Sequence, residues 1–223
     1  MFIDRKDAGE KLARALEKYR DKNVLALAIP RGGVEVGYQV ADYLNAEFSI
    51  IITRKLPFPD NPEAGFGAIA EDGSTFIIRG AAAWLPEETI EAIKRDQIEE
   101  IERRKKVLRG GRPLPPIAGR TVILIDDGIA MGSTMTASIF SCRNQGAGRI
   151  VVAAPVAGKE VAQALEDMVD EVVVLETPPF FRAVAQVYRN WYDVPDSEVI
   201  AILRAWEEGA NLLYRDFNNL VPD

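Results

Sequence analysis

The sequence predicts an α/β fold in which helices cover both faces of a doubly wound, mostly parallel sheet. Three observations predict it: short apolar runs without polar alternation, helical patterns between the runs, and glycine, proline or acidic residues directly after them. Strands buried on both faces have unbroken apolar runs, and strands that alternate with helices favour a parallel sheet. The chain has 223 residues, of which 48% are hydrophobic and 27% charged, so it can bury a sizeable core.

The apolar runs and helical patterns give the expected elements in chain order. The expected strands are residues 24–29, 48–53, 121–125, 150–154 and 171–175. The expected helices are residues 5–19, 34–44, 133–145, 159–168 and 197–208.

Residues 57–120 break this rhythm. Prolines interrupt the chain at its start, and residues 66–78, with the turn dipeptide Asp72-Gly73, indicate a hairpin. Residues 86–108 form a long, highly charged helical pattern that ends at Gly110-Gly111. We therefore expect one domain, residues 1–223, with residues 57–120 inserted as a hood, meaning a segment packed over the carboxyl edge of the sheet.

Composition excludes several kinds of chemistry. The chain has no histidine, which excludes Ser-His-Asp hydrolysis, His-ligated zinc and a histidine base. Its single cysteine, Cys142, allows neither an intrachain disulfide nor a CxxC site, and we expect it to be a buried apolar residue.

Charge and hydropathy indicate the compartment of the protein and the classes of partner that it lacks. A net charge of −7 and a pI near 4.9 do not support nucleic-acid binding. Residues 1–20 are charged throughout, unlike a signal peptide, and the apolar runs are too short to cross a bilayer. We expect a cytoplasmic protein without nucleic-acid or membrane partners.

The strongest local signal is residues 121–138, TVILIDDGIAMGSTMTAS. An apolar strand is followed by two acids, a loop of small residues, and Ser133 and Thr134 at a helix start. Glycines let a backbone approach a ligand, and the N–H groups of a helix start attract anions. Two adjacent carboxylates suit a phosphate ligand only if they contact another part of it, such as the hydroxyls of a ribose. An Asp-Asp-Gly turn without a ligand is the alternative.

The segment IDDGIAMGST resembles the motif by which type I phosphoribosyltransferases bind 5-phosphoribosyl-1-pyrophosphate. It departs from the usual motif at Gly128, Ala130 and Met131, where an apolar residue and threonines are common. The resemblance implies that Asp126 and Asp127 contact the ribose. It also implies that the 5′-phosphate is held by the following loop, whose residues are Gly128, Ile129, Ala130, Met131, Gly132, Ser133 and Thr134, with Thr136 as a further hydroxyl.

Other segments resemble this family in the same order. Pro30-Arg31-Gly32-Gly33, before an expected helix, is similar to its diphosphate loop. Arg54-Lys55 ends the second apolar run and is a second cationic candidate, unless it only caps the strand in solvent. Together with Asn61-Pro62-Glu63 and the Asp-Asp-Gly loop, these segments resemble a bacterial and archaeal subgroup that has no settled acceptor.

The resemblance implies a Mg²⁺-dependent transferase of nucleotide metabolism. It would move the phosphoribosyl group of 5-phosphoribosyl-1-pyrophosphate to a nitrogenous base or related acceptor and release pyrophosphate. Arg31 and Lys55 would face the diphosphate, Asp126 and Asp127 would contribute to the metal site, and Asp127 or Glu63 is the candidate base. The partners are then small molecules, with a homo-oligomer left open.

Two alternatives remain. A protein of the same fold could bind a ribose phosphate as a regulator without catalysis, and a nucleotide phosphatase or kinase is a more distant interpretation. Phe180 and Phe181 could flank an acceptor base. Tyr188, Trp191 and Tyr192 have the spacing of core or interface packing.

Overall fold

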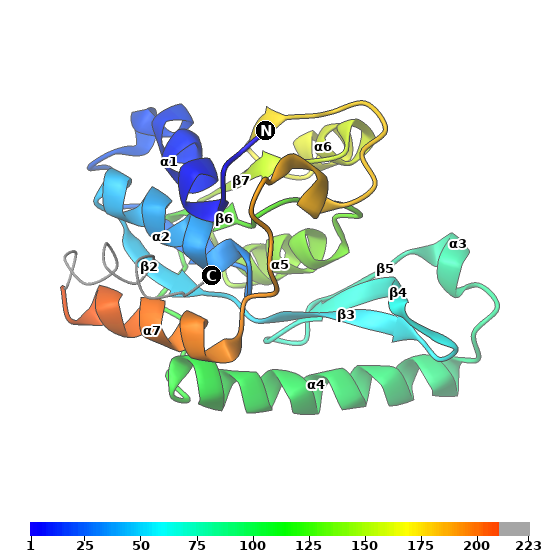
Figure 1. Cartoon of the computed structure of the whole chain (residues 1–223). Helices are drawn as coiled ribbons and strands as arrows, with labels where there is room; N and C mark the ends of the chain where they lie inside the picture. Colours follow the sequence, from blue (N-terminus) through cyan, green and yellow to red (C-terminus); the bar gives the residue numbers. More distant parts are fainter. Residues whose placement is uncertain (210–223) are drawn as a thin grey trace.

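The computed structural model describes residues 1–209 and has a five-stranded parallel sheet at its centre (Figure 1). Its strands are β1 (Leu25–Ala28), β2 (Glu47–Ile50), β6 (Thr121–Ile125), β7 (Arg149–Val156) and β8 (Glu171–Glu176). Their order across the sheet is β2, β1, β6, β7, β8, and every pairing is parallel. The expectation of a parallel sheet made from unbroken apolar runs is confirmed.

Helices cover both faces of this sheet. Helices α1 (Arg5–Ala15) and α2 (Gly33–Leu44) lie on one face, and α5 (Ser133–Asn144) and α6 (Lys159–Glu166) lie on the other. Along β1, Ala26 packs in the same core cluster as Leu12 of α1, whereas Leu27 packs with Met135 of α5. Successive residues of a strand point to opposite faces, so two cores form and the fold is doubly wound.

Residues from Thr53 onward form a second, separate sheet. It is antiparallel, in the order β3 (Thr53–Phe58), β4 (Asn61–Ala70), β5 (Thr75–Ile77). The apolar run at residues 48–53 therefore serves two sheets, because its first part forms β2 and its last residue begins β3. The expected hairpin is confirmed, with Gly73 at φ 88° in its turn, but its first strand pairs with β3 as well.

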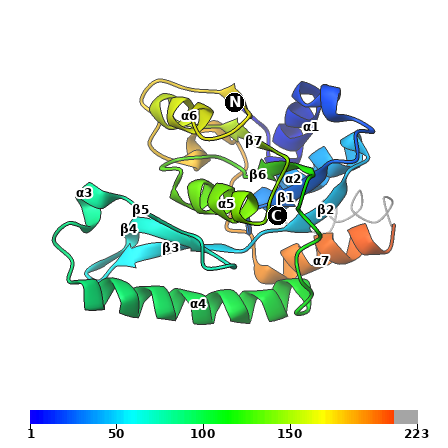
Figure 2. The same ribbon diagram turned by 180° about the vertical axis from the view of Figure 1, so that it is seen from behind.

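The antiparallel sheet projects from the core together with helix α4 (Glu87–Arg109), and short helix α3 (Arg79–Ala82) lies at its far end (Figure 1). Seen from behind, α5 lies on the other side of this sheet from α4 (Figure 2). We call residues 53–109, which are β3–β5, α3 and α4, the hood, in place of the expected range 57–120. Helix α4 ends at Gly110, which has a left-handed backbone conformation.

The C-terminal part of the described chain returns to the first face of the sheet. After β8, short helix η2 (Val184–Val187) leads to α7 (Asp196–Glu207), which packs beside both α2 and α4. A second short helix, η1 (Glu17–Tyr19), follows α1. The single-domain range 1–223 includes residues 210–223, which lie outside the described residues. Within residues 1–209, no helix is both long and apolar enough to span a membrane.

Candidate functional site

A cavity of about 300 Å³ opens at the carboxyl end of β6, between the core and the hood. The core contributes Asp126 and residues 128–134, which connect β6 to the first turn of α5. The hood contributes Lys55 from β3 and Glu63, Gly65 and Gly67 from β4. Ligands of open parallel sheets bind at this edge, and here the hood closes the other side.

The loop at residues 128–134 approaches the cavity with little side-chain bulk. Gly132 has φ 76° and directly precedes α5, whose first residue Ser133 is buried. The N–H groups of the first helical turn have no partner within the helix, so a phosphate can accept hydrogen bonds from them. Met131, which also lines the cavity, is 67% exposed.

The structure gives a steric reason for one departure from the family motif. A Cβ on Gly128 would come within 2.5 Å of Val184 Cγ1 and 2.8 Å of Val156 Cγ1. The apolar side chain that is common at this position would therefore overlap with η2 and β7. In this chain Val184 occupies that space instead.

Asp126 and Asp127 are adjacent in the chain but face different surroundings. Asp126 lines the cavity, and its Oδ1 accepts a hydrogen bond of 2.9 Å from the Asp127 backbone N–H. Burial, and next the charge of Asp127, raise the pKa of Asp126 well above its usual value. Asp127 is not among the residues that line the cavity, and its carboxylate faces helix α1.

Arg5 of α1 is the partner of Asp127, and the sequence did not single it out. Its Nε donates to Asp127 Oδ2 at 2.8 Å, and its Nη1 donates to the Tyr192 carbonyl at 3.0 Å. The guanidinium also lies 4.0 Å from the ring centre of Trp191, and its side chain is only 3% exposed. A separation of 122 residues between Arg5 and Asp127 leaves no local pattern that could have identified the pair.

The predicted diphosphate loop packs directly on the two acids. A Cβ on Gly32 would lie 1.8 Å from Asp127 Oδ2, and one on Gly33 would lie 2.9 Å from Asp126 Cα. Both positions therefore need glycine for close approach rather than for an unusual φ. The side chain of Arg31 points toward α7, with its Nη1 3.6 Å from Asp196 Oδ1.

Arg54 and Lys55 are separated by the alternation of β3. The Nζ of Lys55 donates to the Glu63 carbonyl and lines the cavity. Arg54 points to the other face of the hood sheet, where its Nε donates to Gln97 of α4 at 3.1 Å. Burial and the nearby Arg104 lower the pKa of Arg54. Of this pair, Lys55 is therefore the residue that can contact a ligand in the cavity.

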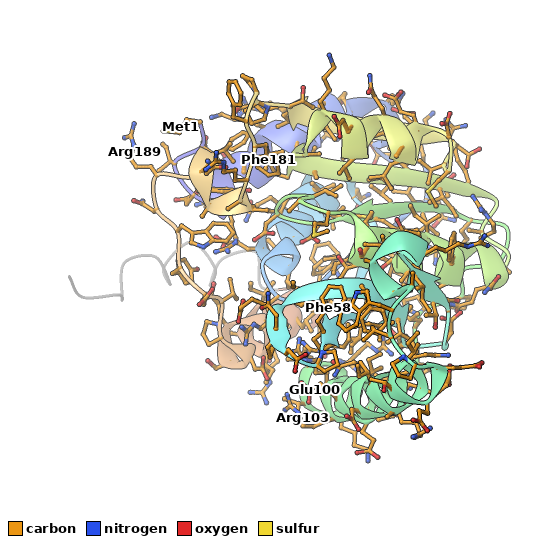
Figure 3. All side chains as sticks on the ribbon, turned by 90° about the vertical axis from the view of Figure 1, so that its right-hand side faces the viewer. Met1, Phe58, Glu100, Arg103, Phe181 and Arg189 are labelled. Carbon is orange, nitrogen blue, oxygen red and sulfur yellow. The ribbon has the colours of Figure 1, made fainter. Side chains whose placement is uncertain are left out.

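A second cavity of about 380 Å³ adjoins the first, and Ala130 lines both. Its walls are the start of α6 and the segment after β8 at residues 178–181. Phe180 is 90% exposed, with φ 60°, and Phe181 is partly buried beside it. Figure 3 shows Phe181 on the core side of the molecule and Phe58 on the hood side.

The aromatic cluster packs behind the acid pair. Tyr188 is buried, and its hydroxyl donates to the Asp127 carbonyl at 2.7 Å. Trp191 packs against Tyr188 with ring centres 5.2 Å apart, and it also covers Arg5. These residues therefore support the loop that carries the acids.

The described residues contain no cluster of three or more Asp, Glu, Cys or His side chains suited to a metal ion. Asp126 has a carboxylate on the cavity, whereas that of Asp127 is paired with Arg5. These residues fit a Mg²⁺ ion that takes most of its oxygen ligands from a bound diphosphate and from water.

Comparisons with known proteins agree on the family of this chain. The family model described as "Phosphoribosyl transferase domain" matches residues 4–190. Two Mycobacterium tuberculosis proteins, from strains CDC 1551 and H37Rv and both named "Putative phosphoribosyl transferase", are 40% identical over 207 residues. The match covers 91% of this chain but 46% of theirs, so the chain spans less than half the length of these relatives.

A solved structure extends the agreement to the fold. The crystal structure of TT1426 from Thermus thermophilus superposes with a TM-score of 0.78 at 36% identity, covering 92% of this chain and 98% of that one. The family match includes both predicted loops, the cavity and Arg5. The chain therefore belongs to the phosphoribosyl transferase domain family.

Proposed function

We propose that the protein transfers the phosphoribosyl group of 5-phosphoribosyl-1-pyrophosphate to a nitrogenous base or a related acceptor, with release of pyrophosphate. One observation carries the proposal: a carboxylate, Asp126, and the loop before α5 face the same cavity of about 300 Å³. A ribose phosphate is a ligand that needs both, because its hydroxyls donate to the acid and its phosphate accepts from the loop.

The chemistry needs placement and stabilisation of charge more than a strong base. As pyrophosphate leaves, positive charge develops at the anomeric carbon and negative charge on the departing group. In our proposal Lys55 and the amide groups of Gly32 and Gly33 stabilise the departing diphosphate, whereas the side chain of Arg31 points toward Asp196 of α7. Asp126 holds the ribose, and Ser133 and Thr134 hold the 5′-phosphate.

Mg²⁺ is proposed to arrive with the diphosphate, since the described residues lack a site of their own for it. Asp126 is the carboxylate that the core side of the cavity offers to it. The ion would neutralise charge on the departing group.

The acceptor is proposed to enter through the second cavity. Phe180 and Phe181 supply ring surface on which a planar base could stack, and Ala130 joins this cavity to the ribose site. For an acceptor that must lose a proton we assign Glu63 as the base, because Glu63 lines the first cavity and the Asp127 carboxylate is paired with Arg5.

The experiment is calorimetric titration with 5-phosphoribosyl-1-pyrophosphate and Mg²⁺, followed by a pyrophosphate-release assay with a panel of nucleobases. We expect binding by the wild type and loss of at least tenfold in affinity in Asp126→Asn. Mg²⁺ and the ribose hydroxyls stabilise the ionised form of Asp126, and charge-assisted hydrogen bonds are worth about 1.5–3 kcal/mol each. Asp60→Asn, an exposed change at the hood turn, is the control.

The outcomes separate the interpretations. Unchanged affinity in Asp126→Asn contradicts the site. Tight binding without pyrophosphate release for any acceptor would instead assign the protein as a non-catalytic ribose-phosphate-binding regulator.

A further inference from the structure

We propose that Arg5 is a positioning residue for the diphosphate end of the site. In this proposal, which rests on the proposed function, Arg5 acts through Asp127 on the loop that contains Gly32. It does not contact the ligand itself.

The guanidinium of Arg5 is held from several sides. It donates to Asp127 Oδ2 at 2.8 Å and to the Tyr192 carbonyl at 3.0 Å, and the Trp191 ring covers it at 4.0 Å. A planar cation with donors in a fixed fork is suited to such an arrangement, and an aromatic face adds to its stabilisation. Arg5 therefore has little freedom to move.

This fixed cation determines where the Asp127 carboxylate lies. The side chains of Arg5 and Asp127 are 3% and 12% exposed, so neither charge is well solvated without the other. Removing one partner of such a pair leaves a buried, uncompensated charge, which has to move toward water or change its protonation. The Asp127 carboxylate would then no longer be held in its place beside the Gly32 backbone.

The Asp127 carboxylate in turn supports the diphosphate loop. Its Oδ2 lies so close to the Gly32 backbone that a Cβ on that residue would be 1.8 Å from it, and 3.0 Å from Arg5 Nε. The loop thus rests on the ion pair, and a displaced carboxylate changes the position of its N–H groups. Hydrogen bonds to a diphosphate are sensitive to such shifts.

The consequence is a division of labour between the two acids. Asp126 serves the ribose end from inside the cavity, whereas Asp127 and Arg5 serve the diphosphate end from beneath the loop. Loss of Arg5 should therefore weaken binding of a diphosphate more than binding of a ribose phosphate. A purely structural role of Arg5 would weaken both ligands alike.

The test compares two ligands, inorganic pyrophosphate with Mg²⁺ and ribose 5-phosphate, by calorimetry on the full chain. For Arg5→Gln we expect pyrophosphate affinity to fall at least tenfold and ribose 5-phosphate affinity to fall less than threefold. Arg5→Lys should lie between the wild type and Arg5→Gln, because one ammonium can reach Asp127 but cannot also reproduce the fork. Arg14→Gln, an exposed change on the same helix, is the matched control and should alter neither affinity.

A double variant tests whether the lost pyrophosphate affinity can be recovered. Arg5→Gln with Asp127→Asn replaces the ion pair by two neutral amides, so pyrophosphate affinity should recover relative to Arg5→Gln alone. If Arg5→Gln does not fold, Asp127→Asn gives the same comparison from the other partner of the ion pair.

Two failures are distinguishable. A wild type that binds neither ligand contradicts the proposed function. A wild type that binds both, with variants at Arg5 that weaken the two ligands equally, contradicts the positioning role and leaves the proposed function standing.

Discussion

At the residue scale, three neighbouring acidic side chains have different surroundings. Asp126 is open to the cavity, Asp127 is paired with Arg5, and Glu35 on α2 is 5% exposed with a buried Oε2 that has no hydrogen-bond partner among the described residues. A buried acid without a partner favours its protonated form. Burial, with Glu198 as the next cause, raises the pKa of Glu35 to about 7.

Glu35→Gln tests this residue through the pH dependence of stability. The folded pKa of about 7 lies above the unfolded value of 4.5, so the folded state binds this proton more tightly. The resulting stabilisation is complete below pH 4.5 and is lost as the pH rises through 7. At about 1.4 kcal/mol per pH unit between these values, the loss is on the order of 3 kcal/mol.

Urea unfolding at pH 4.5 and pH 8 measures the effect. Relative to wild type, Glu35→Gln should gain stability on going from the lower to the higher pH. Glu10→Gln, an exposed change on α1, should show a constant difference. A constant difference for Glu35→Gln as well would contradict the buried, protonated state.

At the element scale, the hood is fixed to the core by its two ends. Where β3 begins, the hydroxyls of Thr53 and Ser138 on α5 are hydrogen-bonded at 2.8 Å. Where α4 ends, Arg109 donates to the Ile50 carbonyl of β2 at 2.9 Å. Glu71, which follows β4, pairs with Arg109 and also accepts from the Ile52 N–H just after β2, so the pair as a whole is bonded to the core. Within α4, the Nε of Arg103 lies 2.7 Å from Glu100 Oε2, and Figure 3 labels both residues on this helix.

Arg109→Met should remove most of this anchoring. The side chains of Arg109 and Glu71 are 4% and 6% exposed, and breaking a buried pair costs about 3–5 kcal/mol because one charge is left uncompensated. Adding Glu71→Gln should recover part of the loss, since the amide oxygen still accepts from the Ile52 N–H and carries no charge.

Urea unfolding measures these changes in free energy. Arg112→Met, in which an exposed ion pair with Glu207 is lost, is the control and should cost under about 1 kcal/mol. A cost for Arg109→Met no larger than that of Arg112→Met would show that the buried pair does not anchor the hood.

At the scale of the whole molecule, the cavity lies between the core and the hood. Its walls come from β6 and α5 of the core and from β3 and β4 of the hood. A ligand that contacts both should stabilise the folded chain as a unit. At a hundred times its Kd, 5-phosphoribosyl-1-pyrophosphate should add about 2.7 kcal/mol to the free energy of unfolding.

Thermal unfolding with and without this ligand and Mg²⁺ checks the expectation. The midpoint should rise for wild type and rise clearly less for Asp126→Asn at the same ligand concentration, because a tenfold loss of affinity leaves about 1.4 of the 2.7 kcal/mol. A rise of equal size in Asp126→Asn would mean that the ligand binds elsewhere.

The chemistry of the site was open to prediction where it depended on local sequence. The segment from β6 into α5 carries its acids, glycines and hydroxyls within a few residues, and all of residues 128–134 line the cavity with Asp126. Adjacent residues of a strand point to opposite faces, so the separation of Arg54 from Lys55 follows directly once residues 53–58 form a strand. The apolar run at residues 48–53 does not indicate that strand.

The sequence by itself determined the parallel sheet, its covering helices, the hairpin and the loop between β6 and α5, because burial on both faces and helix starts leave periodic and local patterns in the chain. Tertiary structure alone decided that Asp127 faces Arg5, that Val184 fills the space above Gly128, and that a second sheet begins at Thr53. The first two contacts join residues more than a hundred and more than fifty positions apart, and no local pattern records which distant side chain will fill a given space. The second sheet pairs nearer residues, but the apolar run that enters it is continuous with β2.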